Sequence, residues 1–414
     1  MISSPALNAL LDATHRAGEF TVDVSDSFEG ANVTREEWDE LVLNVGGDLY
    51  VSYDWCHIWW RHYGGNRRLR LYVFRNGSHL VGLAPMFIER IRLGPINLKT
   101  AKRVGADFSL TIFALPLAPD HIEVAYHELI TKLIQDENCD SVSFSFMPGN
   151  DPTLVGLRRS CESLQGLVSI ARDAPVGPHT KFHLPPSFET YLAQLKKRQR
   201  QNYRRQLKQL GESFKLDSDI IKDPSQAQDA FVNFKALHEH QWQAEGKPGH
   251  FGDWPRSASF NADLAKAMSR LGRFRMVQLS ADRRVVATQY AFVFGDCCYW
   301  RLPARAPEKE LDRFGLGVLG MLQLFEAMIK EGVRRVEAGV GHYDYKMQFG
   351  GEELKIRSFF VAATRPGAAL RAQLFLRLSD LLHFVYYRAW RLRVASRLPL
   401  PGRSLWQTWI RSRV

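Results

Sequence analysis

One order of predicted elements occurs twice in this chain, and it limits the possible folds more than any other feature. Residues 69–90 are typical of two strands joined by an Asn-Gly hairpin turn, and residues 273–300 of three successive strands. Each group precedes a helical pattern and then a further strand, over residues 121–146 in the first half and 318–340 in the second. This repeat predicts a duplicated α/β domain.

Two helical patterns precede each group of strands. Thr34 and Glu37 match a capping box that opens the first helix, and Ser52 is expected to cap the second. The second half has its own pair of predicted helices, residues 188–210 and 227–243. The repeated unit therefore contains two helices before its strands.

A chain of 414 residues is longer than one hydrophobic core usually organises. We expect an α/β protein with tandem mixed sheets flanked by helices. The expected parts are an N-terminal half (18–150), a Gly/Pro-punctuated linker (151–180), a C-terminal half (181–362) and a basic amphipathic helical tail (363–414).

The cysteines and the hydropathy pattern favour a cytoplasmic protein. The five cysteines are odd in number and have no CxxC spacing, which favours buried thiols in a reducing compartment. No segment offers a long uncharged apolar run, and the N-terminus lacks the pattern of a signal peptide. The sequence therefore predicts neither a spanning helix nor secretion.

The net charge of +11 is concentrated in the tail. Residues 365–414 hold ten arginines and a single acid, Asp380. An apolar stripe with Leu374 and Leu381 and several aromatic residues predict an amphipathic helix. We expect peripheral contact with the anionic inner face of the cytoplasmic membrane. Docking of this helix on protein is the alternative.

A glycine-rich turn lies before the long helix of the second half. Arg313 precedes Gly315, Leu316, Gly317 and Val318, whose N–H groups are expected to be free at a helix N-terminus. Helix N-termini bind anions through such groups. The alternative is that the glycines only allow close packing of the helix against the sheet.

A second polar cluster follows the strand that ends near residue 340. It contains His342, Tyr343, Asp344 and Lys346, at the edge of the sheet where ligands usually bind. Group-transfer chemistry needs a base for the nucleophile and proton donors for the negative charge that develops during the reaction. We expect Tyr343 and Lys346 to donate protons and His342 or Asp344 to accept one. A tight turn with packed aromatic residues is the alternative.

The helix around residues 237–243 carries two histidines. His238 and His240 are two residues apart and lie on different faces of a helix, which is poor geometry for a metal, so we expect no metal site. We expect His238 and Trp242 to face the substrate, with Phe251 in a loop that covers it. Packing by the aromatic residues is the alternative.

The helix over residues 191–210 contains seven cations and no acid. We expect Arg200 and Arg204 to contact a partner that carries phosphate or other anionic groups. A solvated basic face is the alternative.

Taken together, residues 191–210, 237–251 and 313–351 resemble the bacterial CelD-like acyltransferases of the GNAT superfamily, which are related to the FemAB-like tandem-domain transferases. The resemblance implies a GNAT-like acyltransferase that uses acyl-coenzyme A as co-substrate. It implies that Arg313 and residues 315–318 bind the pyrophosphate of coenzyme A and that Lys346 binds phosphate or the acyl carbonyl. The anionic partner of Arg200 and Arg204 would then be coenzyme A phosphates, tRNA or an anionic envelope precursor.

The expected reaction moves an acyl group, such as acetyl, to an amine or hydroxyl of a cell-envelope or polysaccharide-related acceptor. Two alternatives stay open. One is a FemAB-like aminoacyl-tRNA-dependent transferase, and tRNA is the only nucleic acid that we expect as a partner. The other is a non-catalytic component of a polysaccharide-synthesis complex. No GxSxG or GxxxxGK[ST] motif supports a serine hydrolase or a P-loop enzyme.

Overall fold

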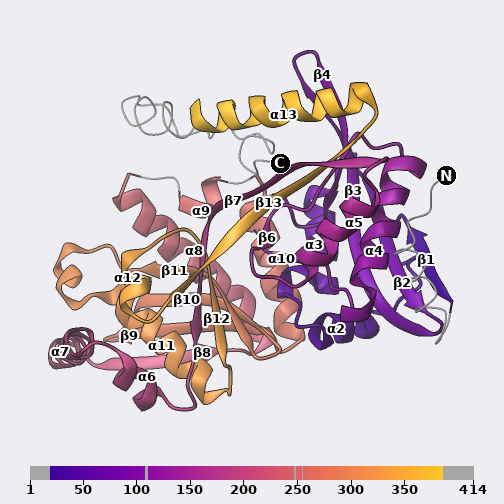
Figure 1. The fold of residues 1–414 in the computed structure, drawn as a ribbon. Helices are drawn as coiled ribbons and strands as arrows, with labels where there is room; N and C mark the ends of the chain where they lie inside the picture. Colours follow the sequence, from indigo (N-terminus) through magenta and orange to yellow (C-terminus); the bar gives the residue numbers. More distant parts are fainter. Residues whose placement is uncertain (1–18, 108–110, 247–248, 254, 386–414) are drawn as a thin grey trace. The chain divides into compact units, whose positions relative to one another are not determined.

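The computed structural model describes residues 19–107, 111–246, 249–253 and 255–385. The chain divides into two compact units, unit 1 (residues 1–177 and 355–414) and unit 2 (residues 178–354) (Figure 1). The chain passes from one unit into the other within two long strands, β7 (Val168–His183) and β13 (Glu352–Ala363).

Unit 1 contains a mixed sheet with helices packed on it. Its further elements are β1 (Phe20–Ser25), α2 (Arg35–Asn44), α3 (Tyr53–Tyr63), β2 (Arg68–Asn76), β3 (His79–Leu93), β4 (Ile96–Arg103), α4 (Ile122–Thr131), β5 (Ser141–Ser143), β6 (Met147–Pro148), α5 (Thr153–Ser163) and α13 (Pro366–Phe384). The strand order is β1-β2-β3-β4-β5-β13, and β6 also pairs with β13. β4 and β5 run parallel, and the other neighbours are antiparallel.

Unit 2 contains the remaining strands, which continue the same 13-stranded sheet from β7 onwards. Its further elements are α6 (Phe188–Gln194), α7 (Lys197–Ser213), β8 (Leu216–Ile221), α8 (Pro224–Ala244), α9 (Gly249–Asp253), α10 (Ser257–Arg270), β9 (Phe274–Ala281), β10 (Arg284–Phe294), β11 (Cys297–Arg305), the 3-10 helix η4 (Lys309–Phe314), α11 (Leu316–Lys330), β12 (Arg335–Val340) and α12 (Asp344–Gln348). The strand order is β7-β12-β11-β10-β9-β8, with β11 and β12 parallel.

The predicted repeat of strands, helix and strand is confirmed, but the helix pair expected before the second group of strands, residues 188–210 and 227–243, is wrong, because β8 separates α7 from α8 and the equivalent pair is α8 and α10. Unit 1 runs β1-α2-α3-β2-β3-β4-α4-β5, and unit 2 runs β8-α8-α10-β9-β10-β11-α11-β12, with the short α9 between its first two helices. In both units three antiparallel strands lead through a helix to a strand that pairs in parallel with the third. The N-terminal group of strands therefore has a third member, β4, that the sequence pattern did not predict.

β4 was not predicted because charged side chains occupy positions of this strand that are buried in the fold. Lys102 and Arg103 are buried in this strand, where an apolar residue is the usual occupant. The amine of Lys102 pairs with Glu89 at 2.9 Å and with Asp107 at 3.2 Å. A buried charge is tolerated when a partner neutralises it, and such partners are recognised only in the folded chain.

The helix starts of unit 1 give one confirmed and one wrong capping prediction. Thr34 and Glu37 form the expected capping box at the start of α2. Ser52 occupies the N-cap position of α3, but its side chain makes no capping hydrogen bond, because its hydroxyl donates to the carbonyl of Leu49 at 2.7 Å. The Ser52 hydroxyl is therefore bonded within the 3-10 turn before α3 and does not cap the helix.

The basic helix predicted over residues 188–210 is interrupted. It forms α6 and α7, separated by Leu195 and Lys196 in extended conformation. Leu195 is buried in the core of unit 2. The break turns an apolar side chain inward, and α7 then continues with most of its basic residues exposed.

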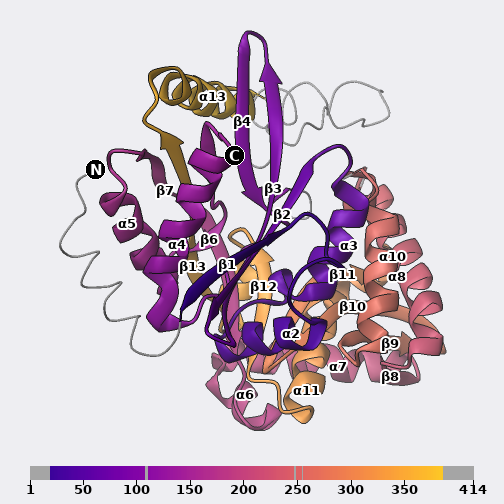
Figure 2. The same cartoon turned by 90° about the vertical axis from the view of Figure 1, so that its right-hand side faces the viewer.

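Helices cover both faces of the unit 2 sheet. Ala287 and Ala291 of β10 belong to the core that α11 completes. Tyr290 points to the opposite face, because successive residues of a strand alternate, and there it contacts Phe231 and Phe234 of α8. Figure 2 shows α8 and α10 side by side next to these strands.

The segment expected to link the halves, residues 151–180, contains α5 and most of β7, and all but its last three residues belong to unit 1. The five cysteines are buried free thiols. Across the described part of the chain, no helix combines the length and hydropathy that crossing a bilayer requires.

Candidate active site

A cavity of about 410 Å³ opens at the N-terminus of α11 in unit 2. We call it the α11 cavity. All four residues of the predicted anion-binding turn, 315–318, line it. The other lining residues are Gln241, Trp300, Pro303, Ala304, Arg305, Asp312 and Tyr345. The turn therefore borders a space that can hold a ligand.

Gly315 shapes the start of α11. Its φ of 63° is left-handed, and a Cβ atom there would lie 2.6 Å from the side-chain nitrogen of Gln206. The N–H of Gly315 donates to Asp312, and the N–H of Val318 donates to Gly315, so two of the four N–H groups expected to be free are used inside the turn. The tight left-handed turn causes this, because it brings donors and acceptors of neighbouring residues together.

The N–H groups of Leu316 and Gly317 have no protein acceptor among the described residues. Gly317 is exposed, and a Cβ atom there would meet only the side chain of Arg305, at 4.0 Å. These two donors stand at the positive end of a 15-residue helix, the geometry in which phosphate groups bind.

Arg305, and not Arg313, is the cation of the α11 cavity. Its guanidinium donates to Asp312 at 3.1 Å, and its backbone N–H donates to the side chain of Gln241 at 3.0 Å. Arg313 does not line the cavity, and its guanidinium lies 4.6 Å from the ring centroid of Phe314. The sequence pattern indicated Arg313, the cation nearest the glycines in the chain, whereas β11 places Arg305 at the cavity.

β11 and β12 separate beside this cavity. Their parallel pairing covers only three residues of each strand and ends at Tyr299 and Glu337. The next carbonyl of β12, that of Ala338, accepts a hydrogen bond of 2.6 Å from the amine of Lys346. The side chain of Lys346 thus satisfies a backbone group that the departing strand leaves unpaired.

Lys346 is a buried amine at this separation. Only 5% of the residue is exposed, and its Nζ lies 4.4 Å from the ring centroid of Tyr343 and 5.8 Å from that of Trp300. Burial lowers the pKa of Lys346 to about 8. Trp300 lines the α11 cavity, so Lys346 stands behind the cavity wall and can exchange a proton near neutral pH.

His342 is held between two carboxylates on the surface. Its Nδ1 lies 2.5 Å from Glu353 and its Nε2 lies 3.0 Å from Asp344. The hydrogen bonds with Glu353 and Asp344 raise the pKa of His342. The imidazole therefore tends to stay protonated, which opposes the role of base that the sequence suggested for it.

Tyr345 lies between two hollows. It lines the α11 cavity and also a groove of about 320 Å³ beside α7, which we call the α7 groove. Burial raises the pKa of Tyr345 to about 12, so its phenol stays protonated at neutral pH. Tyr343, by contrast, is 47% exposed and lines neither hollow.

His238 lies under the cavity wall. It is buried, its Nδ1 lies 3.0 Å from the carbonyl of Pro303, and its Nε2 lies 3.1 Å from Nδ1 of His250. Burial lowers its pKa to about 4. Trp242 and Phe251 contact the His238 ring and, like it, are not among the residues that line the cavity.

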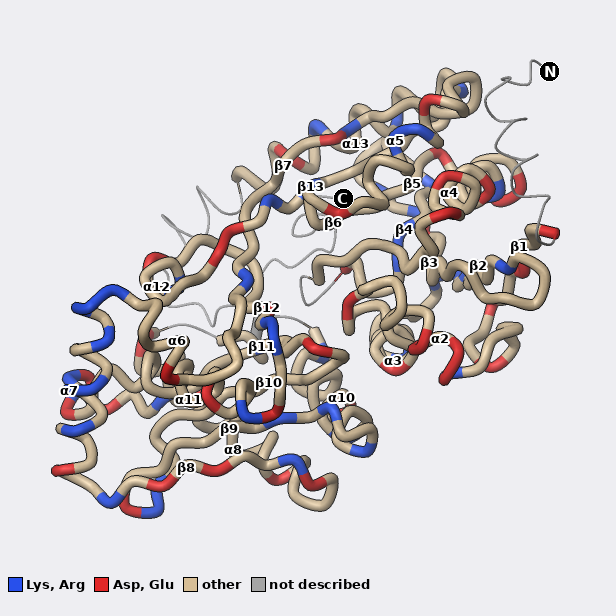
Figure 3. Tube along the Cα trace, turned by 60° about the horizontal axis from the view of Figure 1, so that its bottom comes forward, with Lys and Arg blue, Asp and Glu red and all other residues tan. Residues whose placement is uncertain are grey.

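The cations of α7 are mostly exposed, and Figure 3 shows them along this helix. Arg200 donates to the carbonyl of Ala193 at 3.2 Å, and Arg204 is exposed. Neither lines the α7 groove, whose walls are Arg198, Gln199, Asn202, Gln206, Val318, Tyr345, Gln348 and Phe349.

A buried charge cluster on β7 and β12 was missed by sequence analysis. Glu337 accepts from Lys181 at 2.5 Å and lies 3.3 Å from Nδ1 of His179. Lys181 and His179 help to hold the pKa of Glu337 below its usual value despite its burial. Glu337 is far in sequence from His179 and Lys181, so only the pairing of β7 with β12 reveals the cluster.

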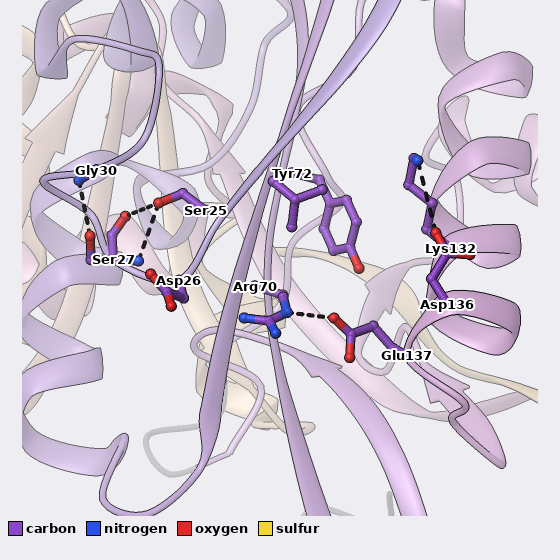
Figure 4. Close-up of a pocket in the computed structure, with 10 residues that line it drawn as sticks. Ser25, Asp26, Ser27, Gly30, Arg70, Tyr72, Lys132, Asp136 and Glu137 are labelled. Carbon is purple, nitrogen blue, oxygen red and sulfur yellow. Dashed lines mark hydrogen bonds and ion pairs between the residues drawn. The ribbon is translucent and has the colours of Figure 1, made fainter.

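Unit 1 has a polar cavity of its own, of about 510 Å³ (Figure 4). Arg70 and Glu137, which lie 2.5 Å apart, and the buried Tyr72 are among its lining residues. No glycine turn at a helix N-terminus borders it. No group of residues able to hold a metal ion occurs in the described part of either unit.

Residues 197–347 match the model of a family described as an acetyltransferase (GNAT) domain. The match runs from α7 to α12 and includes the α11 cavity. The enzyme class expected from the sequence, a GNAT-like acyltransferase, is confirmed by this match. No curated protein matches the chain significantly.

Solved structures share the fold at low identity. FemX covers 79% of this chain and 96% of its own at 11% identity, with a TM-score of 0.57. A conserved protein of unknown function from Bacteroides thetaiotaomicron covers 83% of this chain and 100% of its own at 10% identity, with a TM-score of 0.51. A tandem GNAT protein from the clavulanic acid biosynthesis pathway covers 84% and 99% at 15% identity, with a TM-score of 0.42. The family match, the repeat within the chain and the likeness to FemX confirm the expected fold class, tandem GNAT-like sheets flanked by helices.

Proposed function

We propose that unit 2 transfers an acyl group from acyl-coenzyme A to an amine or hydroxyl of a cell-envelope or polysaccharide-related acceptor, as the resemblance to CelD-like acyltransferases implies. The observation that carries this proposal is the α11 cavity, which brings two free N–H groups of a helix N-terminus next to an arginine. A pyrophosphate group needs this combination of donors and positive charge.

The phosphate-binding role falls to Leu316, Gly317 and Arg305. Within the described ranges the two N–H groups have no protein acceptor, and the Arg305 guanidinium donates to Asp312 and to the carbonyl of Ala306. An incoming phosphate would compete with Asp312 for this guanidinium. Asp312 is exposed, so it can turn to solvent when the ligand enters.

Tyr345 is our candidate for the proton donor to the leaving thiolate. Its phenol lines the cavity and keeps its proton at neutral pH. Lys346, behind Trp300, supplies positive charge when protonated and shifts towards the neutral amine near pH 8. Charge of this kind, held in a site with little water, stabilises a developing oxyanion.

A base for the acceptor is not assigned to His342, since two carboxylates surround that ring. Asp344 is exposed and is the better candidate of the pair named from the sequence. In the FemAB-like alternative, aminoacyl-tRNA would replace acyl-coenzyme A, and the exposed cations of α7 would hold its phosphates.

Thermal unfolding with a panel of acyl-coenzyme A thioesters tests the proposal. A ligand that binds only the folded state stabilises it, by about 2.7 kcal/mol at a concentration one hundred times Kd. We expect at least one thioester to raise the Tm of the native protein, and Arg305→Gln to reduce that rise. An unchanged Tm with every thioester would reject acyl-coenzyme A as the donor.

A further inference from the structure

A second feature lies in unit 1, on α13, and it is independent of the acyltransfer site. One face of α13 packs on unit 1 through Ala368, Ala372, Phe375 and Leu376, which are buried with residues of β3, β4 and β13. In Figures 1 and 2 the helix lies beside the β3–β4 hairpin. This packing fixes which side of α13 faces outward.

The outward side carries a row of exposed apolar residues, which we call the α13 stripe. Leu370 is 59% exposed, Leu374 44%, Leu381 56%, Phe384 61% and Val385 45%. Helical geometry places Leu370, Leu374 and Leu381 within about 40° of one another around the axis. Large apolar side chains aligned along one exposed helix face mark a contact surface.

A basic pocket lies at the N-terminal end of the same helix. This cavity of about 640 Å³ is lined by four cations, Arg90, Lys99, Arg365 and Arg371, and we call it the α13 pocket. The start of α13, residues 366–368, also lines it, together with one carboxylate, Asp140. Four cations beside one acid leave the pocket strongly positive.

Only part of this charge is neutralised within the protein. Asp140 accepts from Arg371 at 2.5 Å and lies 3.6 Å from the guanidinium of Arg365. Arg90 is exposed, and the N–H of Gly367 has no protein acceptor among the described residues. A helix N-terminus adds its own positive potential. The pocket therefore suits an anion such as a phosphate group.

The α13 stripe and the α13 pocket lie along the same helix. Arg371 follows Leu370 in sequence, so the pocket flanks the stripe by about 100° around the axis. A partner with an apolar interior and an anionic boundary could bind the α13 stripe and the α13 pocket at the same time. A bilayer of anionic phospholipids is such a surface, and amphipathic helices lie in its plane with cations at the headgroups.

The sequence beyond α13 has matching chemistry. Residues 386–414 lie outside the described part of the chain, but they contain seven arginines, three tryptophans and no acid. Arginine is attracted to anionic lipid, and tryptophan is enriched at membrane interfaces. We propose that α13 is a membrane-surface helix that places its stripe in an anionic bilayer and binds a lipid phosphate in the α13 pocket.

Vesicle sedimentation with the full-length protein tests this proposal. The native protein is expected to sediment with vesicles that contain phosphatidylglycerol and to stay in solution with phosphatidylcholine vesicles. Leu374→Gln combined with Leu381→Gln, and separately Arg90→Glu, should each lower the partition coefficient by about tenfold or more, since each removes apolar contact or reverses a charge at the lipid surface.

Two matched variants serve as controls. Val232 of α8 is 62% exposed, so Val232→Gln removes an equally exposed apolar side chain elsewhere. Lys208→Glu reverses an exposed charge on α7, where Lys208 is 78% exposed. Both control proteins should sediment with anionic vesicles as the native protein does. All the changed side chains are at the surface, and circular dichroism verifies that each variant is folded.

Several results would overturn the proposal. Unchanged sedimentation of the α13 variants would assign any lipid binding to another part of the chain. If inorganic phosphate raised the Tm of the protein while the protein did not bind vesicles, the α13 pocket would be a site for a soluble anion. A dimer that dissociates on mutation of Leu374 and Leu381 would make the stripe a contact between two copies of the chain.

Discussion

The amine of Lys346 donates a 2.6 Å hydrogen bond to the carbonyl of Ala338, one residue after the parallel pairing of β11 and β12 ends. The separation of two strands thus coincides with a buried lysine and with Trp300, a wall of the α11 cavity. We expect this arrangement to couple the protonation of Lys346 to stability and to catalysis.

The first prediction concerns the pH dependence of stability. The folded pKa of Lys346, about 8, is below its usual value of 10.5, so between these pH values the unfolded chain binds more protons than the folded chain. The burial cost of the charged amine is therefore present in full below pH 8 and disappears as the pH rises towards 10.5. Its size is about 3 kcal/mol.

Denaturant titrations of native protein and Lys346→Met across pH 7 to 10 check this sign. As the pH rises, the unfolding free energy of the native protein should increase relative to that of Lys346→Met. A difference that stays constant with pH would show that Lys346 is not held in a desolvated site.

The second prediction uses Gly317. A methyl group there meets only Arg305 at 4.0 Å, and alanine is favoured over glycine in a helix by about 1 kcal/mol. Gly317→Ala should therefore raise the Tm of the free protein while weakening its stabilisation by acyl-coenzyme A, because the methyl group crowds the phosphate donors. Thermal unfolding with and without ligand separates the two effects. An unchanged ligand effect would place the phosphates elsewhere.

The third prediction uses the neighbouring glycine. Gly315→Ala should lower stability by about 1 kcal/mol or more, since a φ of 63° is left-handed and strained for a residue with a Cβ atom, and the Gln206 side chain must also shift. Urea unfolding measures this loss. Gly317→Ala is the matched control, and a loss of similar size in both variants would contradict the assigned turn geometry.

The fourth prediction concerns His342. Glu353→Gln should lower the pKa of this ring, because the hydrogen bond with Glu353 is the largest influence that raises it. The stabilisation from this pair is present below the ordinary histidine pKa and is lost as the pH rises through the raised value. NMR titration of the imidazole protons measures the pKa directly. An unchanged pKa would mean that the contact does not form in solution.

The fifth prediction separates the two donor classes. Reversing charge at Arg200, Arg204 and Arg205 should leave acyl-coenzyme A binding unchanged, because none of the three lines the α11 cavity. In the FemAB-like alternative the same variant should lose most of its tRNA affinity. The remaining affinity should depend less steeply on salt concentration. Filter binding at several salt concentrations decides between them.

Local patterns were enough to predict parts of the fold. The capping box of Thr34 and Glu37 involves four neighbouring residues, and the duplicated order of strands and helices follows from hydrophobic periodicity. Both depend on short stretches of chain. β4 was missed because the buried charge of Lys102 is neutralised by residues of β3 and of the following turn, which lie close to it only in the folded chain.

The site was predictable only in outline. Gly315 marked the turn, since a left-handed backbone position favours glycine, and Gly317 marked a helix start where the backbone is open to a ligand. The choice of Arg305 over Arg313 depends on how β11 lies beside α11, and the burial of Lys346 depends on where β12 leaves its neighbour. Pairing of distant segments determines both, and no local pattern encodes it.

A structure of the protein with acetyl-coenzyme A bound tests the central claim most directly. The account predicts pyrophosphate oxygens within hydrogen-bonding distance of the N–H groups of Leu316 and Gly317, with the Arg305 guanidinium turned towards them. A coenzyme A molecule bound elsewhere, with the α11 cavity empty, would contradict it.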